Sequence, residues 1–169
     1  MAGKTFTFFS FLLTLSILGF GQGKKFSISD PVLIDKSYNL YHAGDVFLAG
    51  QPTQTNLDSL IDIGVKLVVN LRTDDEMSHL NYDQAKFLKS KKIEYVHIPM
   101  GGDDGYKADA IDKMGKKINK SEGKVLIHCR SAGRATYAWM AWLIRYQDYS
   151  IDEAVRSGSE ARFSVPFFD

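Results

Sequence analysis

The sequence predicts a single α/β domain with a largely parallel central sheet that is flanked by helices. Short runs of apolar and β-branched residues alternate along the chain with longer segments whose apolar residues recur at helical spacing. One run, VKLVVNL at Val65–Leu71, is apolar along nearly its whole length, which is typical of a strand covered on both faces. Strands that alternate with helices form such sheets, and 169 residues suffice for one domain with a core.

The segment from Leu40 to Ile98 is predicted to hold four strands and two helices. Its first two strands, Leu40–His42 and Val46–Ala49, flank a Gly-Asp turn. Thr53 or Thr55 is expected to cap a short helix that ends before Gly64. The other predicted elements, in chain order, are the strand Val65–Leu71, a polar loop at Arg72–Asn81, a helix at Tyr82–Lys91 and a strand at Ile93–Ile98.

The rest of the chain is predicted to hold three helices and one strand, which follow a glycine- and aspartate-rich loop at Met100–Lys107. Ser150 and Glu153 form the capping-box pattern that begins the last helix. Trp139 and Trp142, three residues apart on the preceding helix, are expected to lie in the core. The other elements are a helix at Ala108–Asn119, a strand at Val125–His128 and a helix at Ala135–Tyr146.

Residues 1–21 are expected to form a signal peptide rather than part of the domain. Lys4 provides an early positive charge, Phe6–Phe20 carries no charge, and small residues lie at Gly19 and Gly21. The apolar run is short for a membrane span, and an N-terminal anchor is the alternative interpretation. Cleavage near Gly21 would leave a leader at residues 22–37 and a domain at residues 38–169. The expected location is then periplasmic or secreted, with no membrane attachment.

Composition excludes several classes of function. The net charge of +1 provides no basic surface for a nucleic acid. The single cysteine rules out an internal disulfide framework. His42, His79 and His97 are scattered without the spacing of a metal site, and the sequence contains neither a Walker loop nor a dinucleotide fingerprint. No metal and no cofactor are therefore expected.

The chemistry is concentrated in the stretch VLIHCRSAGRAT, in which a predicted buried strand runs into the one cysteine, Cys129. In a parallel sheet, the loops at the carboxyl ends of the strands form the binding crevice. The backbone N–H groups of Arg130 to Arg134 would point inward ahead of a helix N-terminus, where anions bind. The guanidinium of Arg134 can hold two oxygens of such an anion. The residues small enough to let the backbone close around it are Ser131, Ala132 and Gly133.

The same positive field favours the thiolate form of Cys129 over the thiol. A thiolate beside an oxyanion cradle is an activated nucleophile. His128 is expected to support the loop by hydrogen bonding. The alternative is a cysteine that is merely packed at a strand end, but a histidine and an arginine flank Cys129, so its surroundings are not apolar.

Several short segments resemble a known family. VLIHCRSAGRAT resembles the signature loop of cysteine-dependent protein phosphatases, and VVNLRTDDE and YVHIPM are similar to the preceding strands of the dual-specificity type. The segments FLAGQPT, LVVNLR, VHIPM and HCRS are similar to a bacterial phosphatase-like domain that is also found fused to β-lactamase-like hydrolases. They occur here in the same order and cover roughly Leu40 to Ser157, so the resemblance implies the phosphatase fold.

The resemblance also implies a hydrolase that acts on a phosphate monoester or another oxyanion-bearing substrate. It makes Cys129 the nucleophile that takes up the phosphoryl group, and Arg134 the residue that binds the equatorial phosphate oxygens. The general acid comes from the loop after the YVHIP strand, which offers Asp103 and Asp104, of which Asp103 is preferred. His128 and the loop Arg130–Gly133 are expected to bind the substrate.

Two features depart from the family pattern. Four residues separate Cys129 from Arg134, whereas the family usually has five. Ala135 replaces the hydroxyl residue that commonly follows the arginine and aids hydrolysis of the intermediate, which leaves Thr136 or Ser131 as substitutes. The four-residue spacing resembles the active loop of rhodanese-type sulfurtransferases, whose cysteine carries a persulfide. Sulfur transfer and a non-catalytic anion-binding module are therefore the alternative interpretations.

Overall fold

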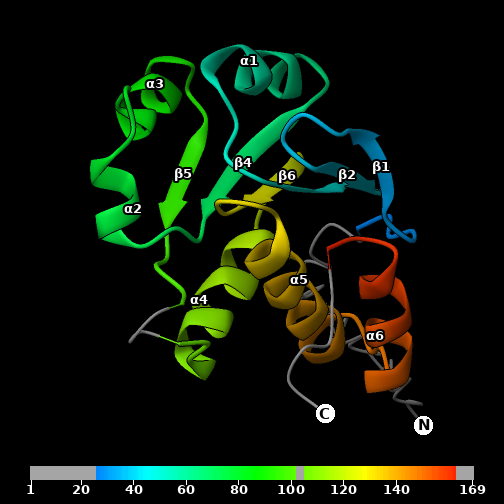
Figure 1. Ribbon diagram of the computed structural model, residues 1–169. Coiled ribbons are helices and arrows are strands. Elements are labelled where there is room, and N and C mark those ends of the chain that lie inside the picture. The colour runs from blue at the N-terminus through cyan, green and yellow to red at the C-terminus, as the bar shows by residue number, and fades with distance from the viewer. Residues whose placement is uncertain (1–25, 102–104, 163–169) are drawn as a thin grey trace, which may run out of the picture.

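Six strands and six helices make up the described part of the chain, residues 26–101 and 105–162 of a computed structural model (Figure 1). The strands are β1 (Val32–Asp35), β2 (Leu40–Ala43), β3 (Val46–Ala49), β4 (Val65–Asn70), β5 (Glu94–His97) and β6 (Lys124–His128). The helices are α1 (Gln54–Asp62), α2 (Asp74–Ser78), α3 (Gln84–Ser90), α4 (Ala108–Ile118), α5 (Gly133–Tyr146) and α6 (Ile151–Ser159). None of these helices is both long enough and apolar enough to cross a membrane.

One sheet with the strand order β1-β2-β3-β6-β4-β5 organises the domain. β1, β2 and β3 pair antiparallel, whereas β3 with β6, β6 with β4, and β4 with β5 pair parallel. The predicted α/β class with a largely parallel sheet is therefore confirmed. The pairing register places Ala49, His128, Asn70 and His97 in one row across the sheet, so the four parallel strands end level with one another.

Helices cover both faces of the sheet (Figure 1). α1 and α3 lie on one face, and α4, α5 and α6 lie on the other. The larger apolar cluster, between the sheet and the second group of helices, contains Trp139 and Trp142, and both are fully buried as predicted. A second cluster, beneath α1 and α3, contains Leu57, Leu60 and Leu88.

Side-chain caps explain where several helices begin. Thr53, rather than Thr55, caps α1, and Ser150 and Glu153 form the predicted capping box of α6. The other predicted helices and strands are present, with ends that differ by a few residues from the expected ones.

The prediction of a loop throughout Arg72–Asn81 is wrong, because this polar segment contains α2. Thr73 accepts a hydrogen bond from the backbone N–H of Glu76, and the Glu76 carboxylate accepts one from the backbone N–H of Thr73. This reciprocal pair satisfies two N–H groups that a helix start leaves open, so five residues without an apolar stripe still form a helical turn.

The described part of the chain includes residues 26–37 of the segment 22–37 that is expected to be a leader. β1 lies within this segment and pairs with β2. Phe26 is 5% exposed, and its ring meets the ring of Trp142 edge-on, with centroids 5.6 Å apart. β1 exposes most of its side chains, so no alternation of apolar and polar residues marks it as a strand. The expected signal peptide, residues 1–21, lies outside the described residues.

Replacing Phe26 tests whether this segment belongs to the folded domain. We expect Phe26→Ala to lower the free energy of unfolding by about 3 kcal/mol, because a buried aromatic ring is removed from its contact with Trp142. Urea denaturation followed by tryptophan fluorescence measures the change. Val32→Ala, on exposed β1, is the control and should alter the same quantity by less than about 0.5 kcal/mol. Equally small effects of both substitutions would contradict the assignment of Phe26 to the core.

Candidate active site

The loop that follows β6 lies at the edge of the sheet where the parallel strands end level with one another. This loop, residues 129–132, connects β6 to the N-terminus of α5, as the sequence predicts. The backbone N–H of Cys129 donates to the carbonyl oxygen of Ala49 at 3.2 Å, and the N–H of Gln51 donates to that of Arg130, also at 3.2 Å. The loop is therefore bound to the segment that follows β3 and continues the pairing of the sheet.

Gly50 allows this close approach between the two segments. It forms an isolated bridge with Ser131. A Cβ atom at Gly50 would lie 2.7 Å from the carbonyl oxygen of Tyr38 and 3.0 Å from that of Arg130. Because real Cβ atoms do not approach backbone oxygens so closely, only glycine fits at this position.

Ala132 makes the turn from the loop into α5. Its φ of 73° lies in the left-handed region, which is unfavourable for a residue with a Cβ atom. Gly133, the residue best suited to such a turn, is instead the first residue of α5. A Cβ atom at Gly133 would meet only the carbonyl oxygen of Arg162, at 3.9 Å. The position whose backbone conformation best suits glycine is therefore Ala132, one residue before Gly133.

The N-terminus of α5 is open toward the loop. α1, α2, α3 and α6 each begin with a side-chain cap, but α5 has neither such a cap nor an acidic residue in its first turn. The first N–H groups of a helix have no partner within the helix, and they form the positive end of its dipole. An oxyanion in the loop would accept hydrogen bonds from these groups.

Arg134 lies in the first turn of α5 and is held by two other segments. Its Nη1 donates to the carbonyl oxygens of Met100 and Leu71 at 2.7 and 3.3 Å, and its Nη2 donates to both carboxylate oxygens of Glu76 at 2.6 and 2.7 Å. Burial alone would lower the pKa of Arg134. The hydrogen bonds to Glu76 and the negative charges of Cys129 and Glu76 outweigh burial and raise it. Arg134 therefore remains charged, and its orientation is set before a ligand arrives.

Glu76 is a site residue that the sequence analysis missed. Its side chain is 20% exposed, and it also accepts a hydrogen bond from the backbone N–H of Thr73 at 2.9 Å. Burial would raise the pKa of the Glu76 carboxyl. The hydrogen bonds from Arg134 and Thr73 and the charges of Arg134 and Arg72 lower it overall. The capping-box pattern TDDE marks Glu76 locally, but Arg134 lies 58 residues further along the chain.

A cavity of about 350 Å³ opens where these segments meet. Two arginines contribute positive charge to its wall and one glutamate contributes negative charge, so the net charge of the lining suits an oxyanion. The lining residues are Thr73, Glu76, Gly101, Arg130, Ser131 and Arg134. Three of the predicted site residues, Arg130, Ser131 and Arg134, are thus brought together around one cavity.

Cys129 and His128 lie on opposite faces of the sheet, because successive side chains of a strand alternate. Cys129 is 1% exposed, belongs to the apolar cluster beneath α5 and is not among the residues that line the cavity. His128 is fully buried beneath α3, with its Nε2 3.0 Å from the Nε2 of Gln84. Burial lowers the pKa of His128 to about 3, so it is neutral near pH 7. It does not line the cavity and supports the loop from the other face.

The two hydroxyl groups considered as substitutes have different surroundings. Thr136 is fully buried in α5, and its hydroxyl donates to the carbonyl oxygen of Ala132 at 3.1 Å. Ser131 is exposed and lines the cavity. Of the two, Ser131 is the one placed to contact a ligand there.

The candidate general acids Asp103 and Asp104 lie outside the described residues. The segment that contains them starts at Gly101, which lines the cavity and whose N–H donates to the carbonyl oxygen of Gly105 at 3.3 Å. Gly101 has a φ of 102°, and a Cβ atom there would lie 3.2 Å from the Cδ of Arg134. Elsewhere in the described chain, no group of three or more histidine, cysteine, aspartate or glutamate side chains is arranged to hold a metal ion.

Comparison with known proteins gives a family match and a curated relative. The family model described as dual specificity phosphatase, catalytic domain, matches residues 46–165. The chain is 29% identical over 90 residues to the beta-lactamase hydrolase-like protein of Xylella fastidiosa. That match covers 52% of this chain but only 21% of the relative, so the chain corresponds to a minor part of that protein.

Two solved structures have a similar fold. A cysteine-to-serine variant of P. aeruginosa TpbA, in complex with phosphotyrosine, has a TM-score of 0.62 at 19% identity, over 78% of this chain and 78% of that chain. A glycine-to-alanine variant of Tk-PTP has a TM-score of 0.61 at 23% identity, over 79% of this chain and 83% of that chain. At these identities the likeness concerns the fold alone.

Glu76→Gln is expected to destabilise the protein in a pH-dependent manner. At pH 7 the free energy of unfolding should fall by about 1–2 kcal/mol, because Arg134 loses its charged acceptor. The lowered pKa of Glu76 means that its contribution is present above the ordinary carboxyl pKa of 4.5 and is lost as the pH falls through the folded-state value. The difference between wild type and variant should therefore shrink below about pH 4.

Chemical denaturation at several pH values measures this difference. Asp75→Asn removes the same charge from the same helix at an exposed position, and it should cause less than about 0.5 kcal/mol of destabilisation at any of them. A wild-type advantage over Glu76→Gln that stays constant from pH 7 to pH 3 would refute the ion pair.

The backbone conformation of the loop predicts that replacing Gly133 is tolerated, whereas replacing Ala132 with a larger residue destabilises the protein. Gly133→Ala should be neutral or stabilise the protein by up to about 1 kcal/mol, because Gly133 has helical geometry and open space. Ala132→Val should cost about 2 kcal/mol, because a β-branched residue is strained at a positive φ. Thermal denaturation of both variants checks the order. Greater damage from Gly133→Ala would contradict the turn at Ala132.

Proposed function

The chain belongs to the dual-specificity phosphatase catalytic-domain family, and from this premise we propose that it hydrolyses phosphate monoesters through a thiophosphate intermediate on Cys129. The observation that carries the proposal is the cavity lined by Arg130, Ser131 and Arg134 at the open N-terminus of α5, next to the loop that begins at Cys129. The TpbA complex with phosphotyrosine supports a phosphorylated substrate for a protein of this fold.

In the first step, the Cys129 thiolate attacks phosphorus, an S–P bond forms and the ester P–O bond breaks. The departing oxygen takes a proton from Asp103 or, alternatively, from Asp104. Arg134 and the loop N–H groups stabilise the negative charge on the phosphoryl oxygens in the transition state. Glu76 orients Arg134 before the substrate binds. Because Nη1 and Nη2 already donate to Met100, Leu71 and Glu76, Arg134 exchanges at least one of these hydrogen bonds when it binds two phosphoryl oxygens.

In the second step, water attacks phosphorus, its proton passes to the same aspartate, and the S–P bond breaks to release inorganic phosphate and the thiolate. A hydroxyl group that donates to the departing sulfur aids this step. The placement of Ser131 in the cavity, and of Thr136 in the core, supports Ser131 as that donor.

One observation favours a second candidate function. The four-residue spacing between Cys129 and Arg134 is that of a sulfurtransferase loop, which suggests a persulfide on Cys129. The family match and the helix α6 that follows α5, where a rhodanese-like chain would continue with a strand, support phosphoryl transfer instead. A non-catalytic module would bind the anion in the same cavity without turnover.

Export is part of the proposal. The charge-free run Phe6–Phe20 after Lys4 supports a signal peptide and hence a periplasmic or secreted phosphatase. N-terminal sequencing of the protein recovered from its cell would test this. A start near residue 22 is expected, and an intact Met1 would contradict export with cleavage.

Intact-protein mass spectrometry after rapid acid quenching separates the three functions. Brief exposure to a small aryl phosphate is expected to add one phosphoryl group at Cys129, and Cys129→Ser should abolish both the adduct and turnover. Ser131→Ala should let the phosphoryl adduct accumulate, because its hydrolysis is slowed by about tenfold or more. A gain of sulfur from thiosulfate, with no phosphoryl adduct, would establish sulfur transfer. Neither adduct, with anion binding retained in Cys129→Ser, would establish a binding module.

A further inference from the structure

β5 forms one edge of the sheet; of the described strands only β4 pairs with it, and α3 packs against it. Just beyond β5, the N–H of Ile98 donates toward β4, to the carbonyl oxygen of Asn70, at 2.9 Å. Backbone groups of successive residues point to opposite edges of a strand. Val96 therefore also faces β4, whereas the N–H and carbonyl groups of Tyr95 and His97 face outward, where another strand could pair with them.

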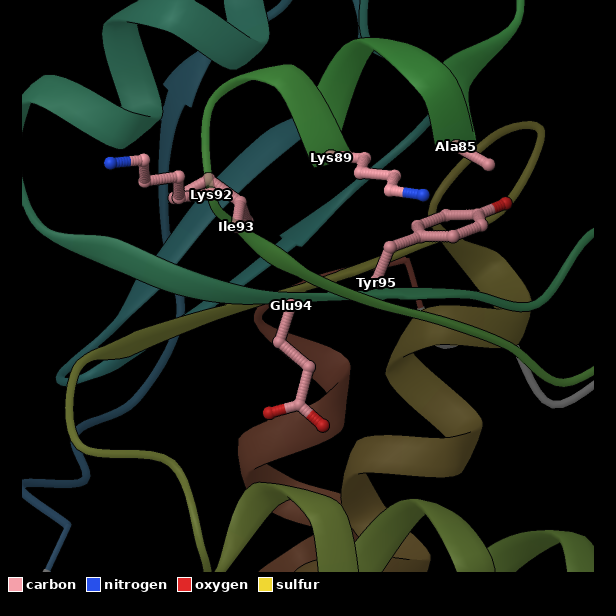
Figure 2. A pocket seen from close by; sticks show the side chains of 6 residues that line it. All are labelled: Ala85, Lys89, Lys92, Ile93, Glu94 and Tyr95. Carbon is pink, nitrogen blue, oxygen red and sulfur yellow. The ribbon is translucent and has the colours of Figure 1, made fainter.

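A groove of about 540 Å³ lies between α3 and this strand (Figure 2). Figure 2 shows the side chains of Lys89 and Tyr95 on the α3 side of the strand, and that of Glu94 pointing to the opposite side. The lining residues are Ala85, Lys89, Lys92, Ile93, Glu94 and Tyr95.

The groove is positively charged. Lys89 and Lys92 are exposed, and neither has a carboxylate partner among the described residues. Glu94 does not neutralise them, because it pairs with Lys117 on the other face of the sheet, with 2.8 Å between Nζ and Oε1. The side chains of Lys89 and Lys92 point in opposite directions (Figure 2), so acidic side chains at different positions of a segment laid along the groove would each meet an uncompensated cation.

The C-terminal end of β5 lies beside a negative charge, and the chain leads from there to the cavity. His97 Nδ1 lies 3.7 Å from the carboxylate of Asp74, whose side chain is 90% exposed. A few residues further along, Gly101 lines the anion cavity. An extended chain of the length from Tyr95 to Gly101 spans about 20 Å.

We propose that this edge docks an extended acidic segment of a phosphorylated protein substrate by β-strand addition. Acidic side chains of the segment lie beside Lys89 and Lys92, and its backbone pairs with Tyr95 and His97. The phosphorylated residue, about six positions away, then reaches the cavity. Asp74 repels acidic side chains near the cavity, so the acidic cluster stands apart from the phosphate rather than next to it. The choice of a phosphorylated partner rests on the proposed function.

Amide hydrogen exchange tests strand addition without catalysis. A non-phosphorylated peptide with a glutamate cluster is titrated into the full chain, and exchange is followed by NMR. The amides of Tyr95 and His97 should exchange more slowly on binding, while that of Val96, already bonded to β4, should not change. Binding without protection at Tyr95 and His97 overturns the proposal. So does protection of both that depends on protein concentration alone, because a second copy then occupies the edge.

Charge reversal tests the groove in kinetics. A phosphotyrosine peptide with glutamates six positions from the phosphate should have a kcat/KM about tenfold above that of its glutamine counterpart. Lys89→Glu combined with Lys92→Glu should abolish this preference. Lys113→Glu combined with Lys120→Glu changes the charge equally at exposed positions of α4 and of the turn that follows it, across the sheet, and should retain the preference.

A small aryl phosphate distinguishes failure of docking from failure of the proposed function. Both double variants should hydrolyse it at the wild-type rate, because none of the four lysines lines the cavity. The docking site is overturned if the wild-type protein shows no preference for the glutamate peptide over the glutamine peptide. It is also overturned if both double variants lose that preference equally. Absence of turnover with every phosphate ester refutes the phosphatase function, and hydrogen exchange with the acidic peptide then decides the docking alone.

Discussion

The candidate site depends on the hydrogen bonds that the guanidinium of Arg134 donates. The guanidinium joins the first turn of α5 to Glu76 in α2 and, through the carbonyl oxygen of Met100, to the chain that leaves β5. A largely buried cation is costly unless its donors find acceptors, so these three segments must keep their relative positions. The level ends of the parallel strands provide those positions, because each segment leaves the sheet from the same row.

The parallel sheet and the location of the cysteine loop could be predicted from the sequence because their signals are local. The apolar run at Val65–Leu71 and the caps at Thr53 and Ser150 each depend on a few neighbouring residues. Cys129 and Arg134 lie in one short stretch between a strand and a helix. Knowing that order was enough to place both at the carboxyl edge of the sheet, beside a helix N-terminus.

The features that escaped prediction depend on contacts between distant segments. β1 exposes its apolar side chains and is ordered by pairing with β2, so its own residues do not identify it as a strand. Glu76 has a local role as part of a capping box, and only the fold reveals that the same carboxylate holds Arg134. The face of His128, by contrast, follows from alternation alone: if Cys129 faces α5, its neighbour must face α3.

The short loop has a chemical consequence that follows from its backbone. Ala132 takes the left-handed turn directly before α5, and the buried hydroxyl of Thr136 bonds to the carbonyl oxygen of Ala132. Within the described residues, the helix therefore presents no hydroxyl to the cavity next to Arg134. Ser131, in the loop on the other side of the turn, lines the cavity instead. In the proposed mechanism, assistance to the departing thiolate therefore comes from Ser131 in the loop rather than from a hydroxyl in the helix.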